Sequence, residues 1–440
     1  GVHSSETMMH LRNISLMSPT RVFTFLALLS LPMAAQVSPV GTTPTVALSS
    51  PASKAEVNAA ATTLQVALSD PENQALTVTF YGRLKTPAPG PDFTLVTLPD
   101  TQFYSENLNN RFPQFLSQTN WIVSSKKTLN TVFVAHMGDM AQNYDAVEDE
   151  FIRADQAMDV IENPATTVLT HGIPWGGAPG NHDIGPGGST KFWNQYFGSA
   201  RWAGRNYWGG NYGSNNNNNY QLFSASGLDF IVVNLIYNAN TDGNQAVLDW
   251  ADALLKAHPD RRAIITSHWL INTSFPPANA DWGGHGKAVY DNLKDNPNLF
   301  LMLCGHIHGE GRRVDVFEGR SVHTVLQDYQ NRSDGEGGGG SWLRYFTFSP
   351  ANNEIRARTF RTTTGAYETD ADSEFTLPYN MTSPAAWVEL GTVNSPGGAA
   401  TTTLDWTGLK PGTDYEWYAA VSDGANPVSS EARSFSVPAP

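Results

Sequence analysis

The chain has almost no cysteine, with one residue, Cys304, among 440. A single cysteine excludes a disulfide bond within the chain. Cys304 ends an apolar run, residues 299–304, and a cysteine in such a run packs as a small hydrophobic side chain. We therefore expect Cys304 to be an inert core residue.

Basic residues are also scarce. The 27 Lys and Arg residues stand against 41 Asp and Glu residues, which gives a formal net charge of −14. A surface with this balance repels polyanions and offers no basic patch. We therefore expect neither nucleic acid nor acidic lipid as a partner.

Long apolar stretches are missing as well, with one exception near the start. Residues 21–35 have a positive flank at Arg21, a short apolar stretch and small residues at the end, the pattern of a secretory signal peptide. A buried helix would instead need polar residues at helical spacing, which this stretch lacks. We expect a signal peptide over residues 8–35, a mature chain that begins near Gln36, and an extracellular or periplasmic location. No later segment is long enough to span a bilayer.

The length of the chain favours two domains, since 440 residues exceed what one hydrophobic core usually serves. Residues 43–84 and 384–438 both carry the alternating apolar and polar pattern of β-strands. Together they would supply the strands of one β-sandwich, and the tail around Leu409-Lys410-Pro411-Gly412 resembles the second half of a fibronectin type III domain. We expect a catalytic domain, residues 92–378, to be inserted into this sandwich; the alternative is two separate small β pieces.

Between these segments, strand patterns alternate with helix patterns. Residues 108–126, 145–161 and 245–257 carry apolar residues at spacings of three and four, which indicates helices. Apolar runs at residues 93–98, 132–137, 263–266 and 299–304 indicate buried strands. The expected fold class of this part is α/β.

Polar side chains with metal-binding chemistry follow these strands. They occur in five segments: Pro99-Asp100-Thr101-Gln102, Gly138-Asp139, Gly180-Asn181-His182-Asp183, Ser267-His268 and Gly305-His306-Ile307-His308. In open α/β sheets the carboxyl ends of neighbouring strands meet where ligands bind. Carboxylates, an amide oxygen and imidazoles gathered at such an edge predict a site for two metal ions.

The ordered set of segments resembles the calcineurin-like metallophosphoesterase superfamily, over residues 92–360. The resemblance implies a four-layer α/β/β/α sandwich with a binuclear metal centre at its rim. Carried over residue by residue, Asp139 would bridge the ions, Asp100 and His308 would complete one site, and Asn181, His268 and His306 the other. It also implies that His182 faces the phosphoryl group and protonates the leaving oxygen, with Asp183 as a candidate to orient it.

Gln102 departs from that resemblance, because the superfamily commonly has histidine two residues after the first aspartate. Glutamine offers a neutral amide oxygen, a harder and weaker donor than imidazole. It would either ligate through oxygen or admit water. The expected cofactors are two divalent ions, Mn, Fe or Zn, and Gln102 favours Mn, Fe or Ca over Zn at the first site.

Among the other histidines, His136, His171, His258 and His323 are interpreted as core or surface residues, whereas His285 lies in a loop expected to border the site. Seven aromatic residues occur near the expected site loops, either as walls of a substrate pocket or as packing: Phe103, Tyr104, Trp175, Trp193, Trp208, Trp269 and Trp282. No Gly-x-Ser-x-Gly motif suggests a serine nucleophile, so the resemblance implies direct attack by a hydroxide that bridges the metals.

The sequence therefore predicts an exported, metal-dependent phosphoesterase that hydrolyses small phosphate esters. Two alternatives stay open. One is a phosphodiesterase or nucleotide hydrolase on the same scaffold. The other is a binding protein with a decayed catalytic site, in which the β-sandwich contacts glycan or a cell surface.

Overall fold

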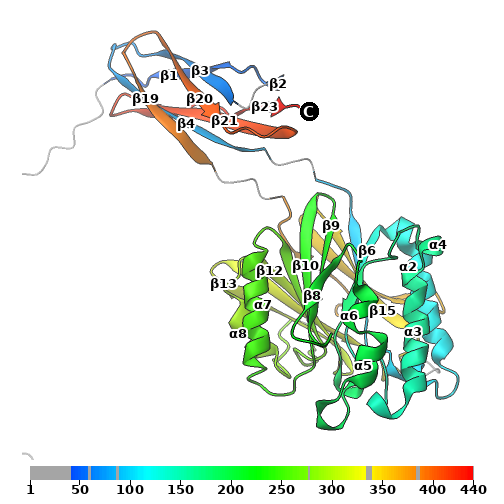
Figure 1. Ribbon diagram of the computed structural model, residues 1–440. Helices are drawn as coiled ribbons and strands as arrows, with labels where there is room; N and C mark the ends of the chain where they lie inside the picture. The colour runs from blue at the N-terminus through cyan, green and yellow to red at the C-terminus, as the bar shows by residue number, and fades with distance from the viewer. Residues whose placement is uncertain are drawn as a thin grey trace, which may run out of the picture. The chain divides into compact units, whose positions relative to one another are not determined.

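The computed structural model describes residues 41–57, 61–85, 89–275, 278–332, 339–382 and 387–439 (Figure 1). The expected signal peptide, residues 8–35, lies outside the described residues, as does the expected start of the tail segment at residue 384. The described residues divide into two compact units. The β unit takes the residues before Arg83 together with Trp387–Gly412 and those from Glu416 onward, and the α/β unit takes the residues between them with Thr413–Tyr415.

The β unit is built from strands of both ends of the chain, drawn in blue and in orange to red in Figure 1. One sheet has the order β1 (Thr45–Ser50), β3 (Ala61–Ser69), β20 (Ala400–Thr407). The other has the order β19 (Val388–Ser395), β4 (Leu76–Leu84), β21 (Thr413–Ser422), β23 (Arg433–Val437), β2 (Ala55–Glu56), with β22 (Pro427–Ser429) on β21. Both sheets therefore join an early strand to a late one, as in the antiparallel pairs of β3 with β20 and β4 with β19.

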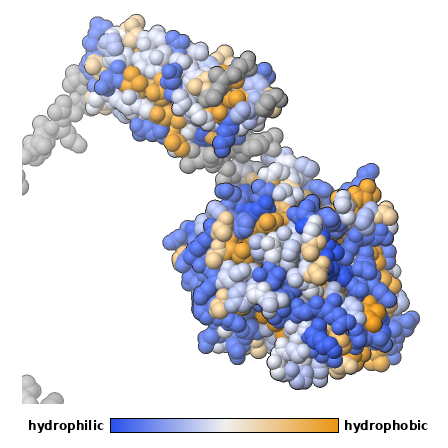
Figure 2. All heavy atoms as spheres, viewed as in Figure 1, coloured by the Kyte–Doolittle hydropathy of each residue, from blue (hydrophilic) through white to orange (hydrophobic). Residues whose placement is uncertain are grey.

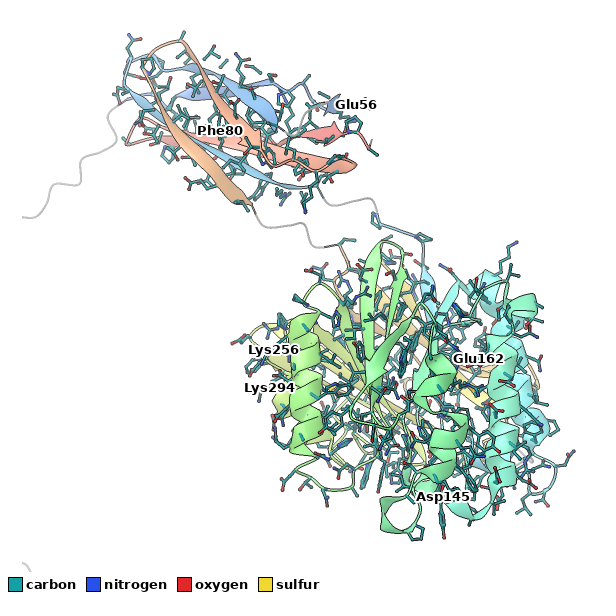
Figure 3. All side chains as sticks on the ribbon, viewed as in Figure 1. Glu56, Phe80, Asp145, Glu162, Lys256 and Lys294 are labelled. Carbon is teal, nitrogen blue, oxygen red and sulfur yellow. The ribbon has the colours of Figure 1, made fainter. Side chains whose placement is uncertain are left out.

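Alternation along these strands fills the interior of the β unit. On β4 the buried residues Leu76, Val78 and Phe80 alternate with more exposed ones. The Phe80 ring, labelled in Figure 3, stacks near Trp417 of β21 with ring centroids 6.2 Å apart. Two short strands, β2 and β22, were not among the expected ones, because runs of two and three residues carry no readable alternation.

The α/β unit is a mixed α/β fold with two sheets. The first has the order β17 (Ala366–Glu368), β16 (Glu354–Arg361), β15 (Trp342–Ser349), β5 (Phe93–Leu98), β6 (Thr131–His136), β7 (Trp175–Gly177), with β18 (Glu374–Pro378) on β16. The second has the order β13 (Gly309–Phe317), β14 (Arg320–Asp328), β12 (Leu299–Cys304), β11 (Arg262–Ser267), β10 (Leu228–Leu235), β9 (Asn219–Ala225), β8 (Trp208–Asn211). The pairs β5 with β6, β6 with β7, β10 with β11, β11 with β12, and β12 with β14 are parallel.

Helices lie between the strands in the sequence. They are α1 (Gln102–Glu106), α2 (Phe112–Leu129), α3 (Glu148–Glu162), α4 (Pro164–Thr167), α5 (Lys191–Tyr196), α6 (Ser199–Trp202), α7 (Gln245–Ala257) and α8 (Gly286–Leu293), with short 3-10 turns at Tyr144–Ala146, Asn181–Asp183 and Pro186–Gly188. On α3 the buried residues Phe151, Ala154, Met158 and Ile161 follow the helical spacing expected of one apolar face. No helix in the described ranges combines the length and apolar character needed to cross a membrane.

Three apolar clusters hold the unit together. In the first, residues of α2, α3, α5 and α6, such as Phe115 and Phe151, pack with β5, β6 and β15. In the second, Phe93, Phe133 and Phe346 of the first sheet pack with Phe230 and other residues of the second. The third combines α7 and α8 with the other face of the second sheet. On the face drawn in Figure 2, hydrophobic residues of this unit form separate groups among hydrophilic ones, in line with the acidic composition.

Candidate metal centre

The five polar segments leave the carboxyl ends of strands β5, β6, β7, β11 and β12 or the turns just after them. Backbone hydrogen bonds tie these ends together: Met137 N donates to Leu98 O (2.9 Å), and Gly305 N donates to His268 O (2.9 Å). Asp100, Asp139 and His306 have positive φ angles of 43°, 54° and 72°. Such strained conformations turn the side chains sharply out of the strand direction, and they gather at functional sites.

Two glycines make room for the carboxylates. A Cβ atom on Gly180 would collide with the backbone and side chain of Asp139, and one on Gly305 would collide with the Asp100 carboxylate. Any other residue at either position would push a carboxylate out of place. The glycines of the Gly180-Asn181-His182-Asp183 and Gly305-His306-Ile307-His308 segments are therefore part of the site.

Asp100, Asp139 and His268 form the centre of the cluster, with ligand atoms that all lie within 4.8 Å of one another. His268 Nε2 lies 3.1 Å from Asp139 Oδ2 and 3.6 Å from Asp100 Oδ1. His306 joins them, since its Nδ1 lies 3.1 Å from His268 Nε2 and its backbone N donates to the Asp100 carboxylate at 3.2 Å. His268 Nδ1 donates to the Met137 carbonyl oxygen at 2.8 Å, which leaves Nε2 to face the carboxylates.

The charges of this cluster are strongly coupled. Burial raises the pKa of Asp100 well above its usual range, and the nearby charge of Asp328 adds to this effect. Burial also opposes ionisation of Asp139, but the positive charge of His268 outweighs it and holds the Asp139 pKa below its usual value. Burial opposes the charged form of His268, yet Asp139 and Asp100 raise its pKa to about 10. A proton on His268 therefore balances buried carboxylates, and a bound cation would displace that proton.

Gln102, at the start of α1, also reaches the cluster. Its Nε2 donates to Asp139 Oδ2 at 3.0 Å, and its Oε1 is buried with no hydrogen-bond partner in the described part of the chain. A 180° rotation of the amide exchanges the two atoms. The side chain can thus serve the carboxylate as a donor or a cation as an oxygen ligand.

The Gly180-Asn181-His182-Asp183 turn brings three further polar side chains. Asn181 Oδ1 is buried and, within the described ranges, has no hydrogen-bond donor. His182 N donates to Asp139 Oδ1 at 2.8 Å. The His182 Nδ1 atom lies 2.9 Å from the Gln142 carbonyl oxygen, and because a carbonyl only accepts, Nδ1 carries the proton and Nε2 is left for other contacts.

Asp183 is placed differently from its neighbours. Its fully buried carboxylate accepts hydrogen bonds from the backbone N–H groups of Gly180 (2.9 Å), Ala141 (2.9 Å) and Met140 (3.2 Å). Burial and the charge of Asp139 raise the Asp183 pKa to about 7. Asp183 thus fixes the two loops that carry Asp139 and Asn181, whereas the group in contact with the His182 ring is the Gln142 carbonyl.

His308 lies apart from the compact cluster. Its side chain is 49% exposed, and its Nε2 lies 3.9 Å from Oδ2 of the fully buried Asp328. Asp328, the last residue of β14, was not among the predicted site residues. The sequence signal was weak, because residues 322–326 read Val-His-Thr-Val-Leu, a strand-like stretch interrupted by two polar residues, before Gln327-Asp328.

Aromatic rings cover the imidazoles. Trp269 lies over His306 with ring centroids 4.8 Å apart, and Tyr237, which was not predicted, lies 5.8 Å from His268 and 5.4 Å from His306. Trp269 and Trp282 also line a cavity of about 710 Å³ with polar residues that include Asp242, Asn272 and Lys287. Both interpretations of the aromatic residues therefore apply, because Tyr104, Trp175, Trp193 and Trp208 pack in or against the first apolar cluster instead.

Two other histidines are buried beside the centre. His136 Nε2 lies 2.9 Å from Thr101 Oγ1, and His285 Nε2 lies 2.7 Å from Ser267 Oγ. Burial lowers their pKa values to about 3 and about 4, so both are neutral near pH 7. Thr101 follows the predicted ligand Asp100 in the sequence, and Ser267 precedes the predicted ligand His268. His285, like His136, therefore supports a loop of the centre.

The chemistry of the donor set fits divalent cations. Buried carboxylates face one another, and buried oxygen atoms of Gln102 and Asn181 point to no donor within the described residues. These oxygen and imidazole ligands follow strands of both sheets, and their chemistry suits Mn, Fe or Zn. Of the predicted ligands, the structure links Asp100, Gln102, Asp139, His268 and His306 into one connected cluster, with Asn181 on the adjoining turn and His308 farther out.

The chain was compared with known protein families, curated proteins and solved structures. Residues 94–310 match the family model of the calcineurin-like phosphoesterases. The uncharacterized protein YvnB of Bacillus subtilis strain 168 is 31% identical over 76% of this chain, which spans only 26% of that relative. Two solved structures are similar at low identity. GAP50, the anchor in the inner membrane complex of Plasmodium, has a TM-score of 0.40 at 12% identity, covering 66% of this chain and 89% of that one. Vacuolar protein sorting 29 from Cryptosporidium parvum has a TM-score of 0.27 at 11% identity, covering 66% and 100%.

Proposed function

Because residues 94–310 form a calcineurin-like phosphoesterase domain, we propose that this chain is a secreted phosphoesterase that uses two divalent ions, Mn, Fe or Zn, to hydrolyse small phosphate esters. The observation that carries the proposal is the contact of Asp100, Asp139 and His268, three buried ionisable side chains within 4.8 Å of one another. Packing gives no reason to bury such groups together, whereas cation binding does.

The chain's own residues suggest how the ions would be held. Asp100, Gln102, Asp139 and His308 would hold one, and Asp139, Asn181, His268 and His306 the other. When bound, two such ions would lower the pKa of a water molecule, bind phosphoryl oxygens and stabilise an in-line displacement. Gly180 and Gly305 let the carboxylates approach, and the neutral His306 offers a free electron pair, because burial and the charge of His268 lower its pKa to about 4.

His182 supplies proton transfer in this proposal. Its Nδ1 is fixed on the Gln142 carbonyl at 2.9 Å, so its ring orientation is set and Nε2 is available to a substrate. A histidine in this position protonates the leaving oxygen as the ester bond breaks. Asp183 keeps the His182 turn against the Asp139 loop through backbone hydrogen bonds.

The proposal also includes a layered catalytic domain, its insertion into a β-sandwich, and export from the cell. The three apolar clusters, with a sheet on each side of the middle one, support a four-layer α/β/β/α arrangement. The pairing of β3 with β20 and of β4 with β19 supports a fibronectin type III-like sandwich, residues 43–84 and 384–438, into which the catalytic part, residues 92–378, is inserted. Export rests on the signal-peptide pattern of residues 21–35 alone.

Substitution of the bridging carboxylate tests the function. Asp139→Asn removes one charge with little change in volume, and we expect it to abolish phosphate release from p-nitrophenyl phosphate with Mn²⁺ present. Asp229→Asn, on an exposed carboxylate near the start of β10, removes the same charge away from the site and should keep full activity. Circular dichroism should show both variants folded. Full turnover by Asp139→Asn would refute the proposal.

One observation favours a second candidate, a phosphodiesterase. The cavity of about 710 Å³ is lined by Trp269, whose ring also lies over His306, and it has room for a second ester group. Comparison of bis-p-nitrophenyl phosphate with p-nitrophenyl phosphate separates the two, because a diesterase turns over the former at least as fast. A decayed binding protein would turn over neither and would take up no metal ion.

A further inference from the structure

Asp328 is placed by the sheet next to the metal centre. In the parallel pair of β12 and β14, Leu326 is the partner of Cys304, so Asp328, two residues on, lies at the level of His306. In the antiparallel pair of β13 and β14, Asp328 is the partner of Gly309, the residue after His308. The register of three strands thus brings the Asp328 side chain to the Gly305-His306-Ile307-His308 segment.

The Asp328 carboxylate is buried and only half satisfied. Oδ1 accepts a hydrogen bond from Gln330 N at 2.9 Å. Oδ2 has no hydrogen-bond donor in the described part of the chain, and His308 Nε2 lies 3.9 Å from it. The side chain is 0% exposed. A buried carboxylate oxygen without a donor is costly, and a cation relieves that cost.

A second acidic side chain of the same unit, Glu310, offers a comparison with Asp328. Glu310 is also buried, but its oxygens contact Arg344, Arg332 and Ser373. Its charge is therefore matched by guanidinium groups, although Asp370 and Asp372 place carboxylate oxygens within 4.8 Å of it. Asp328 has no such partner among the described residues: it shares its surroundings with the carboxylates of Asp100 and Asp139 and with His308.

We propose that Asp328 is a further ligand of the first metal ion, together with Asp100, Gln102, Asp139 and His308. This inference rests on the proposed function. It gives a physical reason for Gln102, because the neutral amide supplies no charge and Asp328 supplies an anionic oxygen at the same site. The combination of carboxylates and an amide oxygen selects a hard cation such as Mn²⁺ over Zn²⁺.

Metal binding by the full chain tests the assignment without any measurement of catalysis. We would titrate the chelator-treated protein with Mn²⁺ by isothermal calorimetry and count bound ions by elemental analysis after dialysis. Asp328→Asn should weaken binding of one of two ions by at least about 10-fold, the smallest loss typical even of residues that only orient a ligand, and leave the other unchanged. Asp229→Asn should bind both ions as the wild type does, which controls for the loss of one negative charge.

The outcomes separate this inference from the proposed function. If the wild type binds two ions and folded Asp328→Asn binds both with the same affinities, Asp328 is not a ligand, although the metal centre stands. If the wild type binds no ion, the centre and the ligand assignment both fail. If Asp328→Asn does not fold, Asp328→Glu keeps the charge and displaces the carboxylate by one methylene. We then expect weaker binding of one ion, and unchanged binding would overturn the assignment.

Discussion

Gln102 donates a hydrogen bond from Nε2 to Asp139 Oδ2 at 3.0 Å, so the neutral amide touches the carboxylate that is proposed to bridge both ions. An imidazole in place of the amide would be a stronger ligand for borderline metals. We predict that Gln102→His raises the affinity for Zn²⁺ relative to Mn²⁺ by about 10-fold, because the imidazole matches Zn²⁺ better than the amide does.

Competition titrations of Zn²⁺ against Mn²⁺ measure that ratio. Asn120→His, on an exposed position of α2 in the same unit, places an extra histidine away from the centre and should leave the ratio as in the wild type. An unchanged ratio in Gln102→His would show that residue 102 does not face the metal.

The contact of His182 Nδ1 with the Gln142 carbonyl leads to a second prediction. If His182 protonates the leaving oxygen, its loss should matter most for esters whose alcohol is a poor leaving group. We expect His182→Asn to lower kcat by about 10²- to 10⁴-fold for phenyl phosphate and far less for p-nitrophenyl phosphate, whose phenolate leaves without help. Equal losses on both substrates would assign His182 to binding instead. Metal uptake should stay at the wild-type level.

Burial and the neighbouring carboxylates oppose ionisation of Asp100, and metal ions, which favour the ionised form, should therefore stabilise the α/β unit. Binding of one ion at a concentration 100 times its Kd adds about 2.7 kcal/mol to the free energy of unfolding. We predict that Mn²⁺ raises the Tm of the chelator-treated protein by several degrees in differential scanning calorimetry, and that Asp139→Asn loses most of this shift. If millimolar Mn²⁺ leaves the Tm of the wild type unchanged, that result would contradict a native metal centre.

The ligand-bearing ends of β5, β6, β11 and β12 could be predicted because each follows an apolar run, and runs such as residues 93–98 are buried along their whole length in the structure. The strand before the Gly180 segment, β7, has only three residues, Trp175–Gly177, and carries no such run. The predicted first residues of two helices differ from those in the structure by three or four positions. The helix expected from residue 108 begins at Phe112, because Asn107 ends α1 in a left-handed conformation and Pro113 opens a new helix. The helix expected from residue 145 begins at Glu148, because the Asp145 carboxylate, labelled in Figure 3, accepts from Ser189 Oγ and Phe192 N.

Asp328 was missed for a different reason. The family pattern ends with His308, and nothing in the sequence says that β14 returns beside β12. Sheet order is a long-range property, fixed here by the packing of the second sheet. Trp175 and Trp193 were ambiguous for the same reason, because loops rich in tryptophan look alike whether they cover a core or line a cavity.

A last prediction concerns pH and the end of α3. Glu162, labelled in Figure 3, accepts from Trp175 Nε1 (2.6 Å), Arg201 Nε (3.0 Å) and Arg205 (2.6 Å). Burial opposes ionisation of Glu162, but the hydrogen bonds and positive charges of these partners outweigh burial and hold the Glu162 pKa below its ordinary value of 4.5. A depressed pKa gives stability that is present above the unfolded value and is lost as pH falls through the folded one.

Glu162→Gln keeps the shape and removes the charge. We expect it to lower the free energy of unfolding by about 1–3 kcal/mol at pH 7, the range for hydrogen bonds to charged groups. The difference from the wild type should shrink as pH falls below about 4.5, where the unfolded glutamate is already protonated. Urea unfolding at pH 7 and pH 3.5 measures both values. Glu148→Gln, at the exposed start of the same helix, serves as the control, and its smaller effect is expected because water screens an exposed charge. A difference for Glu162→Gln that grew on acidification would reverse the sign of the linkage and rule out the network as the stabilising contact.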